Sequence, residues 1–282
     1  MRSRPSRGDA LLLGAVQGPT ELLPVSSSAH IALLARAMGA SRRMAADAEI
    51  YDTELYDALE VALHGGAALA LLLVGRHELR RAAREMTSSR FVTGVLAAAP
   101  PALAGWLLER GGVTRAPGPR TIAAGLALGG VAMALADRRL EVRELAEVGP
   151  RDGLALGIAQ ALALLPGVSR NGATLTAARA RGFERRDAQA LSWRVGLPVL
   201  LGATGLRAQR LWRGGGVTPA ARRTLMVGVG AAFASTLASA GTLRGGQPAG
   251  PLLPFALYRV ALATLVVRRC GESPAPPAGG AQ

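Results

Sequence analysis

Ionisable and hydroxyl side chains are concentrated in one short stretch of the sequence, QGPTELLPVSSSAH, at residues 17–30. The surrounding segment, residues 10–35, is otherwise apolar, with Glu21 as its sole charged residue and His30 as its sole histidine. Ionisable groups inside a bilayer are costly and face a partner or an aqueous cavity, so this cluster predicts a functional site. A simpler interpretation is that the serines cap the helix that follows them.

The polar groups of this stretch are spaced so that they can act on one ligand. Gln17 and Glu21 are four residues apart and project from the same face of a helix. Three serines open the next helical piece: Ser26, Ser27 and Ser28. Free N–H groups and the helix dipole favour an anion at such a helix start. His30 follows Ser27 by three residues, and a hydroxyl near an imidazole and an acid is the pattern of an activated nucleophile.

A second polar cluster surrounds Arg170, the single cation of residues 153–178. Its neighbours at a predicted helix start are Ser169, Asn171 and Thr174. A planar guanidinium with hydroxyl and backbone donors suits the oxygens of a phosphate. A lone arginine could equally extend to the membrane surface. Together with an acid, a serine and a histidine, however, it predicts a phosphate site.

Two further histidines are given simpler interpretations. His64 lies within a predicted span beside Gly65 and Gly66. Buried polar groups mostly need only a hydrogen-bond partner, so His64 is predicted to be a core residue rather than a catalyst. His77 falls in an arginine-rich segment and is predicted to be solvated.

The composition is that of a polytopic membrane protein. Half of the 282 residues are hydrophobic and 36 are glycine. Charge-free runs approach the ~20 residues that cross the hydrocarbon core as a helix. Four such runs favour membrane spans over the single buried helix of a soluble protein, and they lie at residues 91–108, 121–136, 153–169 and 224–243.

The predicted fold class is an all-α polytopic membrane protein with six transmembrane helices plus two re-entrant helical hairpins. The spans are predicted at residues 59–75, 91–108, 121–136, 193–211, 224–243 and 254–267. Each hairpin consists of two helical pieces too short to span alone, separated by a proline-containing loop. These pieces are residues 9–23 with 28–38, and 153–165 with 172–181. Loops are predicted at residues 39–57, which are acidic, and at 76–90, 138–151 and 207–223, which are basic.

The two hairpins form an internal repeat. Gln17 is followed nine residues later by Ser26, and Gln160 is followed nine residues later by Ser169. Each copy precedes three predicted spans, and an odd number of spans inserts the second copy upside down, which is an inverted-topology repeat. The alternative is chance similarity of two Leu-Leu-Pro loops.

A single integral membrane domain, residues 1–282, is therefore expected. Its first repeat covers about residues 9–137 and its second about 152–268. Residues 271–282 are rich in proline and glycine and are expected to be disordered.

The basic residues do not indicate nucleic-acid binding. All 33 are arginine and the net charge is +14, but they cluster between apolar runs, as positive loops between spans do. Aromatic residues that could stack on bases are scarce, at three Trp, three Tyr and four Phe. The single cysteine, Cys270, excludes an internal disulfide and a cysteine-based metal site.

The segments QGPTELLPVSSSAH and LLPGVSRNGAT resemble the two signature segments of the bacterial undecaprenyl-diphosphate phosphatases, known also for bacitracin resistance. The resemblance covers nearly the whole chain, including LHGG at residues 63–66 and PFALYR at 254–259. It implies a multi-pass protein of the bacterial plasma membrane that hydrolyses undecaprenyl diphosphate to the monophosphate and inorganic phosphate. This reaction recycles the lipid carrier of cell-wall synthesis. Whether two copies of the protein form a homodimer stays open.

The resemblance also implies roles for individual residues. Ser27 is the candidate nucleophile, His30 the acid/base and Arg170 a ligand of the diphosphate. The residues expected to be catalytic are Glu21, Ser27, His30 and Arg170, and those expected to bind substrate are Gln17, Ser26, Ser28, Ser169, Asn171 and Thr174. Attack by a water molecule that His30 activates stays open as an alternative to the serine nucleophile.

The chain departs from the family pattern at one position, and at another it has the glutamine form rather than the glutamate form. Asn171 stands where the family usually has serine, which retains a hydrogen-bond donor and removes a hydroxyl. Gln17 is the glutamine form of the first signature, so Glu21 is the one acid of residues 10–35 and the expected metal ligand. Family members are helped by Mg2+ or Ca2+, and here the substrate's own diphosphate is expected to bridge such a cation.

Two other functions are weighed against this one. Inverted repeats with broken helices are typical of carriers, so a polyprenyl-phosphate flippase or transporter is the main alternative. Another lipid-phosphatase family uses a lysine, and a histidine six residues after its Ser-Arg pair. This chain has no lysine and has Thr176 at that offset, which excludes that family.

Overall fold

The computed structural model describes residues 5–43, 53–111, 118–213, 218–244 and 250–271, and within these ranges every named element is helical. The first half of the chain contributes α1 (Arg7–Leu22), α2 (Ser27–Arg43), α3 (Thr53–Arg84), α4 (Ser88–Arg110) and α5 (Pro119–Ala136). The second half contributes the 3-10 helix η1 (Leu145–Glu147), α6 (Pro150–Leu162), α7 (Arg170–Ala180), α8 (Arg185–Arg213), α9 (Pro219–Arg244) and α10 (Leu253–Gly271). The all-α prediction is confirmed.

Four of the described helices are long and apolar enough to cross a membrane. These segments are Leu55–Arg84, Ser88–Arg110, Pro119–Ala136 and Pro219–Gly241. The predicted spans at 193–211 and 254–267 are helical, as parts of α8 and α10, but these two helices fall outside that group. Their arginines, such as Arg194 and Arg259, lower the apolar character of a window. The membrane location is therefore confirmed with four candidate spans.

Several predicted loops are helical. The segment 76–90 was predicted as a loop, but α3 continues through Arg84 because its arginine, alanine and leucine residues are good helix formers. The chain turns just before α4, where the Thr87 hydroxyl accepts a hydrogen bond from the Arg90 N–H at 3.3 Å. Likewise, α8 continues to Arg213 within the predicted loop 207–223. The acidic segment 39–57 is helical at both ends, within α2 and α3, and its residues 44–52 lie outside the described residues, as does the tail 272–282.

The two predicted pairs of short helices are present. α1 and α2 are separated by residues 23–26, and α6 and α7 by residues 163–169. Both α1 and α6 open with an acidic residue that accepts from the backbone of its own N-cap. Asp9 accepts from Ser6 N at 2.7 Å, and Asp152 accepts from Gly149 N at 3.0 Å. With 16 and 13 residues, α1 and α6 are shorter than the ~20 that a span needs.

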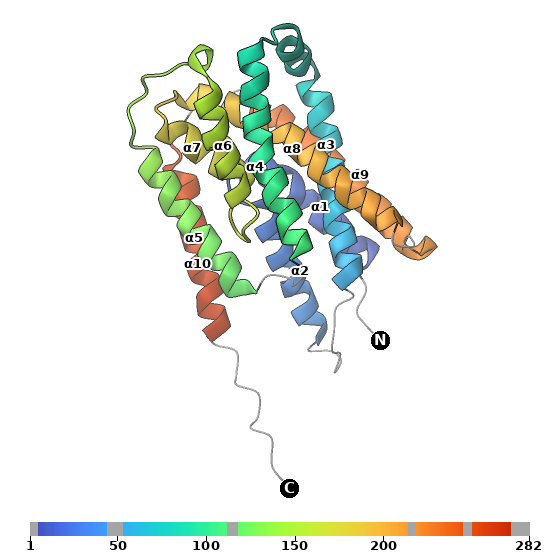
Figure 1. Ribbon diagram of the computed structural model, residues 1–282. Coiled ribbons are helices and arrows are strands. Elements are labelled where there is room, and N and C mark those ends of the chain that lie inside the picture. Colours follow the sequence, from blue (N-terminus) through green and yellow to red (C-terminus); the bar gives the residue numbers. More distant parts are fainter. Residues whose placement is uncertain (1–4, 44–52, 112–117, 214–217, 245–249, 272–282) are drawn as a thin grey trace.

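Each of these short helices packs against a long helix from the other half of the chain. α1 lies against α9, and α6 lies against α4 (Figure 1). Glycines allow close approach, because a Cβ at Gly14 would lie 2.9 Å from Ala232 N and one at Gly157 would lie 2.8 Å from Pro100 Cγ. Such small-residue contacts are typical of helices packed in membranes.

Two apolar clusters follow this pairing. One joins α1, α2, α3 and α9 through Leu13, Ile31, Leu59 and Ala232. The other includes α6, α7, α8 and α4 through Leu156, Leu175, Leu191 and Ala97. In addition, α5 and α10 lie side by side (Figure 1). The four helices of the first cluster have counterparts in the second, which also includes Met133 of α5 and Ala256 of α10.

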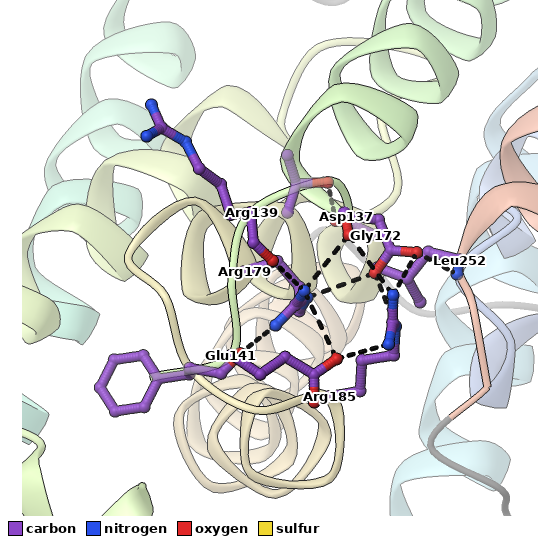
Figure 2. Close-up of polar contacts among 9 residues, drawn as sticks. Asp137, Arg139, Glu141, Gly172, Arg179, Arg185 and Leu252 are labelled. Carbon is purple, nitrogen blue, oxygen red and sulfur yellow. Dashed lines mark hydrogen bonds and ion pairs between the residues drawn. The ribbon is translucent and has the colours of Figure 1, made fainter. Parts of the chain in front are cut away.

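A buried ion-pair network joins the ends of α5, α7, α8 and α10 (Figure 2). The Asp137 carboxylate accepts hydrogen bonds from Arg179 Nε at 3.2 Å, Arg185 Nε at 2.9 Å and Leu252 N at 2.9 Å. Arg185 also pairs with Glu141. Because Arg179 is 1% exposed, the carboxylate compensates a charge that is removed from water.

Candidate active site

The carboxylate of Glu21 is the centre of the polar cluster. Glu21 lies near the end of α1 and is 6% exposed. Its Oε1 accepts from Arg170 Nη2 at 2.6 Å, and its Oε2 accepts from Ser27 Oγ at 2.7 Å and from Gln17 Nε2 at 3.1 Å. The structure therefore brings together four of the residues that the sequence singled out, and they come from both hairpins.

The loop between α1 and α2 places Ser27 next to this carboxylate. α1 ends at Leu22, and the chain turns before α2 starts at Ser27. Ser26 has a φ of 76°, in the left-handed region that non-glycine residues rarely adopt. Strained backbone of this kind persists where the surrounding structure holds it, and it is common at functional sites. The turn returns the chain so that the Ser27 hydroxyl reaches an acid six residues earlier.

The second hairpin places Arg170 opposite Ser27. Arg170 is the first residue of α7, and Ser169 caps that helix by accepting from Gly172 N at 3.1 Å. Gly196 of α8 leaves room for the guanidinium, because a Cβ there would overlap Arg170 Nη1. The side chain is thus directed from the start of α7 onto Glu21, and the start of α7 contributes the positive end of a helix dipole.

His64 is a neighbour of this cluster that the sequence interpretation did not assign to it. Its Nε2 lies 3.8 Å from Glu21 Oε2, and its Nδ1 donates to the Glu60 carbonyl at 2.9 Å. The core-residue prediction for His64 is therefore incomplete, since the ring faces the central acid. The signal in the sequence was an ionisable residue inside a predicted span, followed by Gly66, which packs α3 closely against α9.

His30 has different partners from those expected. Its Nδ1 donates to the Ser26 carbonyl at 2.7 Å, and its Nε2 lies 2.7 Å from the Tyr258 hydroxyl. The two rings are stacked with centroids 5.7 Å apart. Both ring nitrogens are thus engaged away from the Ser27 hydroxyl, which bonds Glu21 instead. Although His30 lies in the same hairpin as Ser27, neither of its two hydrogen bonds reaches the Ser27 hydroxyl.

The other predicted substrate ligands divide into two groups. Ser28 is half-buried, and its hydroxyl lies 3.5 Å from that of Ser26, which is buried. Asn171 and Thr174 are buried and act within the protein: Asn171 Nδ2 donates to the Leu22 carbonyl at 2.9 Å, and Thr174 Oγ1 donates to the Arg170 carbonyl at 2.9 Å.

Ser192 of α8 completes the contacts of these two residues. Its hydroxyl donates to Asn171 Oδ1 at 2.8 Å and lies 2.5 Å from the Thr174 hydroxyl. These hydrogen bonds fix the start of α7 against the end of α1 and against α8. The amide of Asn171 therefore positions the second hairpin, since its donor and its acceptor are both used within the protein.

The side chains of this cluster do not form a metal site on their own. Within the described residues there is no group of three histidine, cysteine or acidic side chains that could hold an ion. Both oxygens of Glu21 already accept hydrogen bonds. The remaining candidate ligand is Gln17 Oε1, which is buried and has no hydrogen-bond partner among the described residues. One amide oxygen does not fit the six or more oxygen ligands that Mg2+ or Ca2+ takes.

The fold and the site define an integral membrane protein in which an acid, a serine and an arginine from two pairs of short helices converge. Comparison with known proteins identifies the family: residues 10–265 match the family described as bacitracin resistance protein BacA, and the chain belongs to it. It is 31% identical to the undecaprenyl-diphosphatase 2 of Paramagnetospirillum magneticum, with 92% of this chain and 97% of the relative covered. It is 36% identical to the undecaprenyl-diphosphatase of Gemmatimonas aurantiaca, over 91% of this chain and 95% of the relative.

Proposed function

We propose that the protein is an undecaprenyl-diphosphate phosphatase of the bacterial plasma membrane, which releases inorganic phosphate and recycles the lipid carrier for cell-wall synthesis. The observation that carries the proposal is the convergence of Ser27 and Arg170 on one buried carboxylate, that of Glu21. The relatives, named as undecaprenyl-diphosphatases, support the lipid substrate. The polyprenyl tail lies between the helices, and the diphosphate lies where the two hairpin loops meet.

The chemistry follows from the hydrogen bonds of Glu21. Ser27 Oγ attacks the terminal phosphorus while its proton passes to Glu21 Oε2, 2.7 Å away. A phosphoserine forms, and the bond from phosphorus to the bridging oxygen breaks, so that undecaprenyl phosphate leaves. Water then hydrolyses the phosphoserine, which releases inorganic phosphate and returns a proton to Ser27. Arg170 and the start of α7 stabilise the negative charge that develops on the phosphoryl oxygens.

The two histidines take different parts in this scheme. His64 faces the acid that receives the serine proton, since its Nε2 is 3.8 Å from Glu21 Oε2, and it orients that acid or exchanges a proton with it. His30 bonds the Ser26 carbonyl and Tyr258, so it supports the loop that precedes Ser27. An attacking water in place of Ser27 remains the alternative, and Ser27→Ala separates the two.

If Mg2+ or Ca2+ takes part, it would enter with the substrate. The Glu21 carboxylate is occupied by Ser27 and Arg170, so most of the cation's ligands would have to come from the diphosphate. Gln17 Oε1 is the one buried oxygen of the cluster that is free to add a contact. A bound cation supplies charge neutralisation of the diphosphate.

Six spans, two re-entrant hairpins and an inverted repeat remain the architecture that we propose. Three observations support the repeat. α1 packs on α9 as α6 packs on α4, the two hairpins start with equivalent capping acids, and the two apolar clusters share four corresponding helices. The breaks between the helices fall directly before Ser27 and Arg170, as in carriers whose broken helices form the binding site.

A phosphate-release assay tests this function against the flippase alternative. The purified protein in detergent is expected to release phosphate from undecaprenyl diphosphate. Phosphate release is measured in parallel with EDTA and without it. Movement of the lipid across liposomes without phosphate release would instead favour a carrier. A homodimer also remains a proposal, and the mass of the detergent-solubilised protein tests it.

A further inference from the structure

Arg259, in α10, is a fully buried cation that has no acidic partner in the described part of the chain. It is 1% exposed, and among the described residues no ion pair includes it. An isolated buried charge is strongly unfavourable unless hydrogen bonds satisfy it. Arginines inside membrane proteins pair with carboxylates or with backbone carbonyls, and they are functional far more often than incidental. What Arg259 binds therefore indicates its role.

The guanidinium of Arg259 binds the loops of both hairpins. Nη1 donates to the Pro24 carbonyl at 3.2 Å, and Nη2 donates to the Gly167 carbonyl at 3.2 Å. Pro24 precedes Ser27 by three residues, and Gly167 precedes Arg170 by three residues. One side chain thus connects equivalent points of the two loops that directly precede the nucleophile candidate and its facing cation.

Helix α5 provides the support for this side chain. Arg259 Nη2 also donates to the Gly125 carbonyl, and Nε donates to the Leu126 carbonyl, both at 3.3 Å. Two glycines leave the space that the guanidinium fills: a Cβ at Gly172 would lie 2.5 Å from Nη1, and a Cβ at Gly129 would overlap Nη2. A planar guanidinium with its donors in a fixed fork suits several carbonyls at once, whereas a lysine ammonium is a single point charge.

We propose that Arg259 is a positioning residue that ties the loops of the two hairpins together and thereby holds Ser27 and Arg170 on Glu21. The catalytic part of this inference rests on the proposed phosphatase function. The structural part does not, because it concerns the order of two loops. Arg259 acts through the backbone at Pro24 and Gly167, so its loss displaces the reacting groups without removing any of them.

Arg259→Met removes the donors at similar side-chain length. We expect faster amide hydrogen exchange in both loops, residues 23–26 and 163–169. We also expect a fall in kcat on the order of 100-fold, because small displacements of reacting groups have effects of that size. Arg259→Lys keeps the charge but lacks the fork, so it is expected to resemble Arg259→Met in both measurements.

Arg179→Met is the matched control. Arg179 is equally buried, but it binds Asp137 in the network of Figure 2, and it lies nine residues after Arg170, about 2.5 turns along α7. Its loss is expected to lower the unfolding temperature while leaving loop exchange and the kcat of the folded fraction unchanged. Equal effects of both variants on exchange and kcat would overturn the proposal, because they would indicate a general packing defect.

Gly129→Ala tests the same inference without altering Arg259. Alanine favours the helix, but its Cβ occupies the place of Nη2, so loop exchange should rise and kcat should fall. Gly105→Ala in α4, where a Cβ would contact nothing within 4 Å, is the control. The proposal would be overturned if amide hydrogen exchange of the two loops in Arg259→Met equalled that of the wild type. It would also be overturned if Arg259→Lys had the loop exchange and kcat of the wild type. If the wild type releases no phosphate, the proposed function fails while the exchange comparison still decides the role of Arg259.

Discussion

Glu21 Oε1 and Arg170 Nη2 lie 2.6 Å apart, although 149 residues separate them in the chain. The ion pair joins the end of α1 to the start of α7, and both side chains are largely shielded from water. It therefore connects the two hairpins and places the positive charge next to the hydroxyl of Ser27.

Arg170→Met is expected to destabilise the protein by up to about 3–5 kcal/mol, because it leaves the Glu21 carboxylate buried without its charge partner. Phosphate release should be abolished as well. Adding Glu21→Gln should recover part of the stability and none of the activity. Thermal unfolding in detergent measures the first effect, and additive destabilisation in the double variant would argue against a coupled pair.

Ser27→Ala is expected to lower phosphate release by about 10³-fold or more, since the hydroxyl is the proposed nucleophile. Thr264→Ala, which removes an exposed hydroxyl that bonds only its own helix at Val260, serves as the control. Trapping of a phosphorylated serine by mass spectrometry in the wild type would add direct support. Turnover at the wild-type rate in Ser27→Ala would show that water attacks instead.

His64→Ala is expected to lower kcat by about 10²-fold, the lower end of the range for a group that assists proton transfer. His30→Ala should have the smaller effect on kcat, because its ring bonds the Ser26 carbonyl and Tyr258 rather than Glu21. His64→Gln retains a hydrogen-bond donor but exchanges no proton near neutral pH. Recovery of kcat in this variant would indicate that His64 only orients the acid.

Asp152 is expected to make stability depend on pH. Burial acts to raise its pKa, but hydrogen bonds from Arg143, Gly149 N and Arg181 lower the pKa to about 2, from an ordinary value of 3.8. A folded-state pKa below the unfolded value gives stability that is present above about pH 4 and is lost as the pH falls toward 2. The difference in unfolding temperature between wild type and Asp152→Asn should therefore shrink over this window. A difference in unfolding temperature that stays constant over this pH window would contradict the prediction.

Divalent cations are expected to bind with the substrate rather than before it. Without undecaprenyl diphosphate, Mn2+ should show no tight binding by electron paramagnetic resonance, since the one carboxylate of the cluster is occupied. Adding the diphosphate lipid should create a bound signal, and EDTA should remove it. Tight Mn2+ binding to the protein alone would point to a protein-built site, and its loss in Gln17→Ala would locate that site.

Much of the site could be predicted because its parts are local in the chain. The i, i+4 spacing of Gln17 and Glu21 places both side chains on one helix face, and the structure joins them at 3.1 Å. The repeat of the Gln-to-Ser spacing marked Arg170 as the complement of the first hairpin. Boundaries of the helices were predicted less well, because α3 continues as a solvent-exposed helix through the arginines that were interpreted as a loop.

The sequence by itself determined the membrane class, the two short helical pairs and the residue types of a phosphate site, since hydropathy, proline breaks and helical spacing depend on neighbours in the chain. Only the tertiary structure decided which groups meet. It turned His64 toward Glu21, directed His30 to Tyr258, and placed Arg259 between the two loops. Such contacts depend on how the helices pack, and packing is set by many weak interactions between segments that are far apart in the sequence.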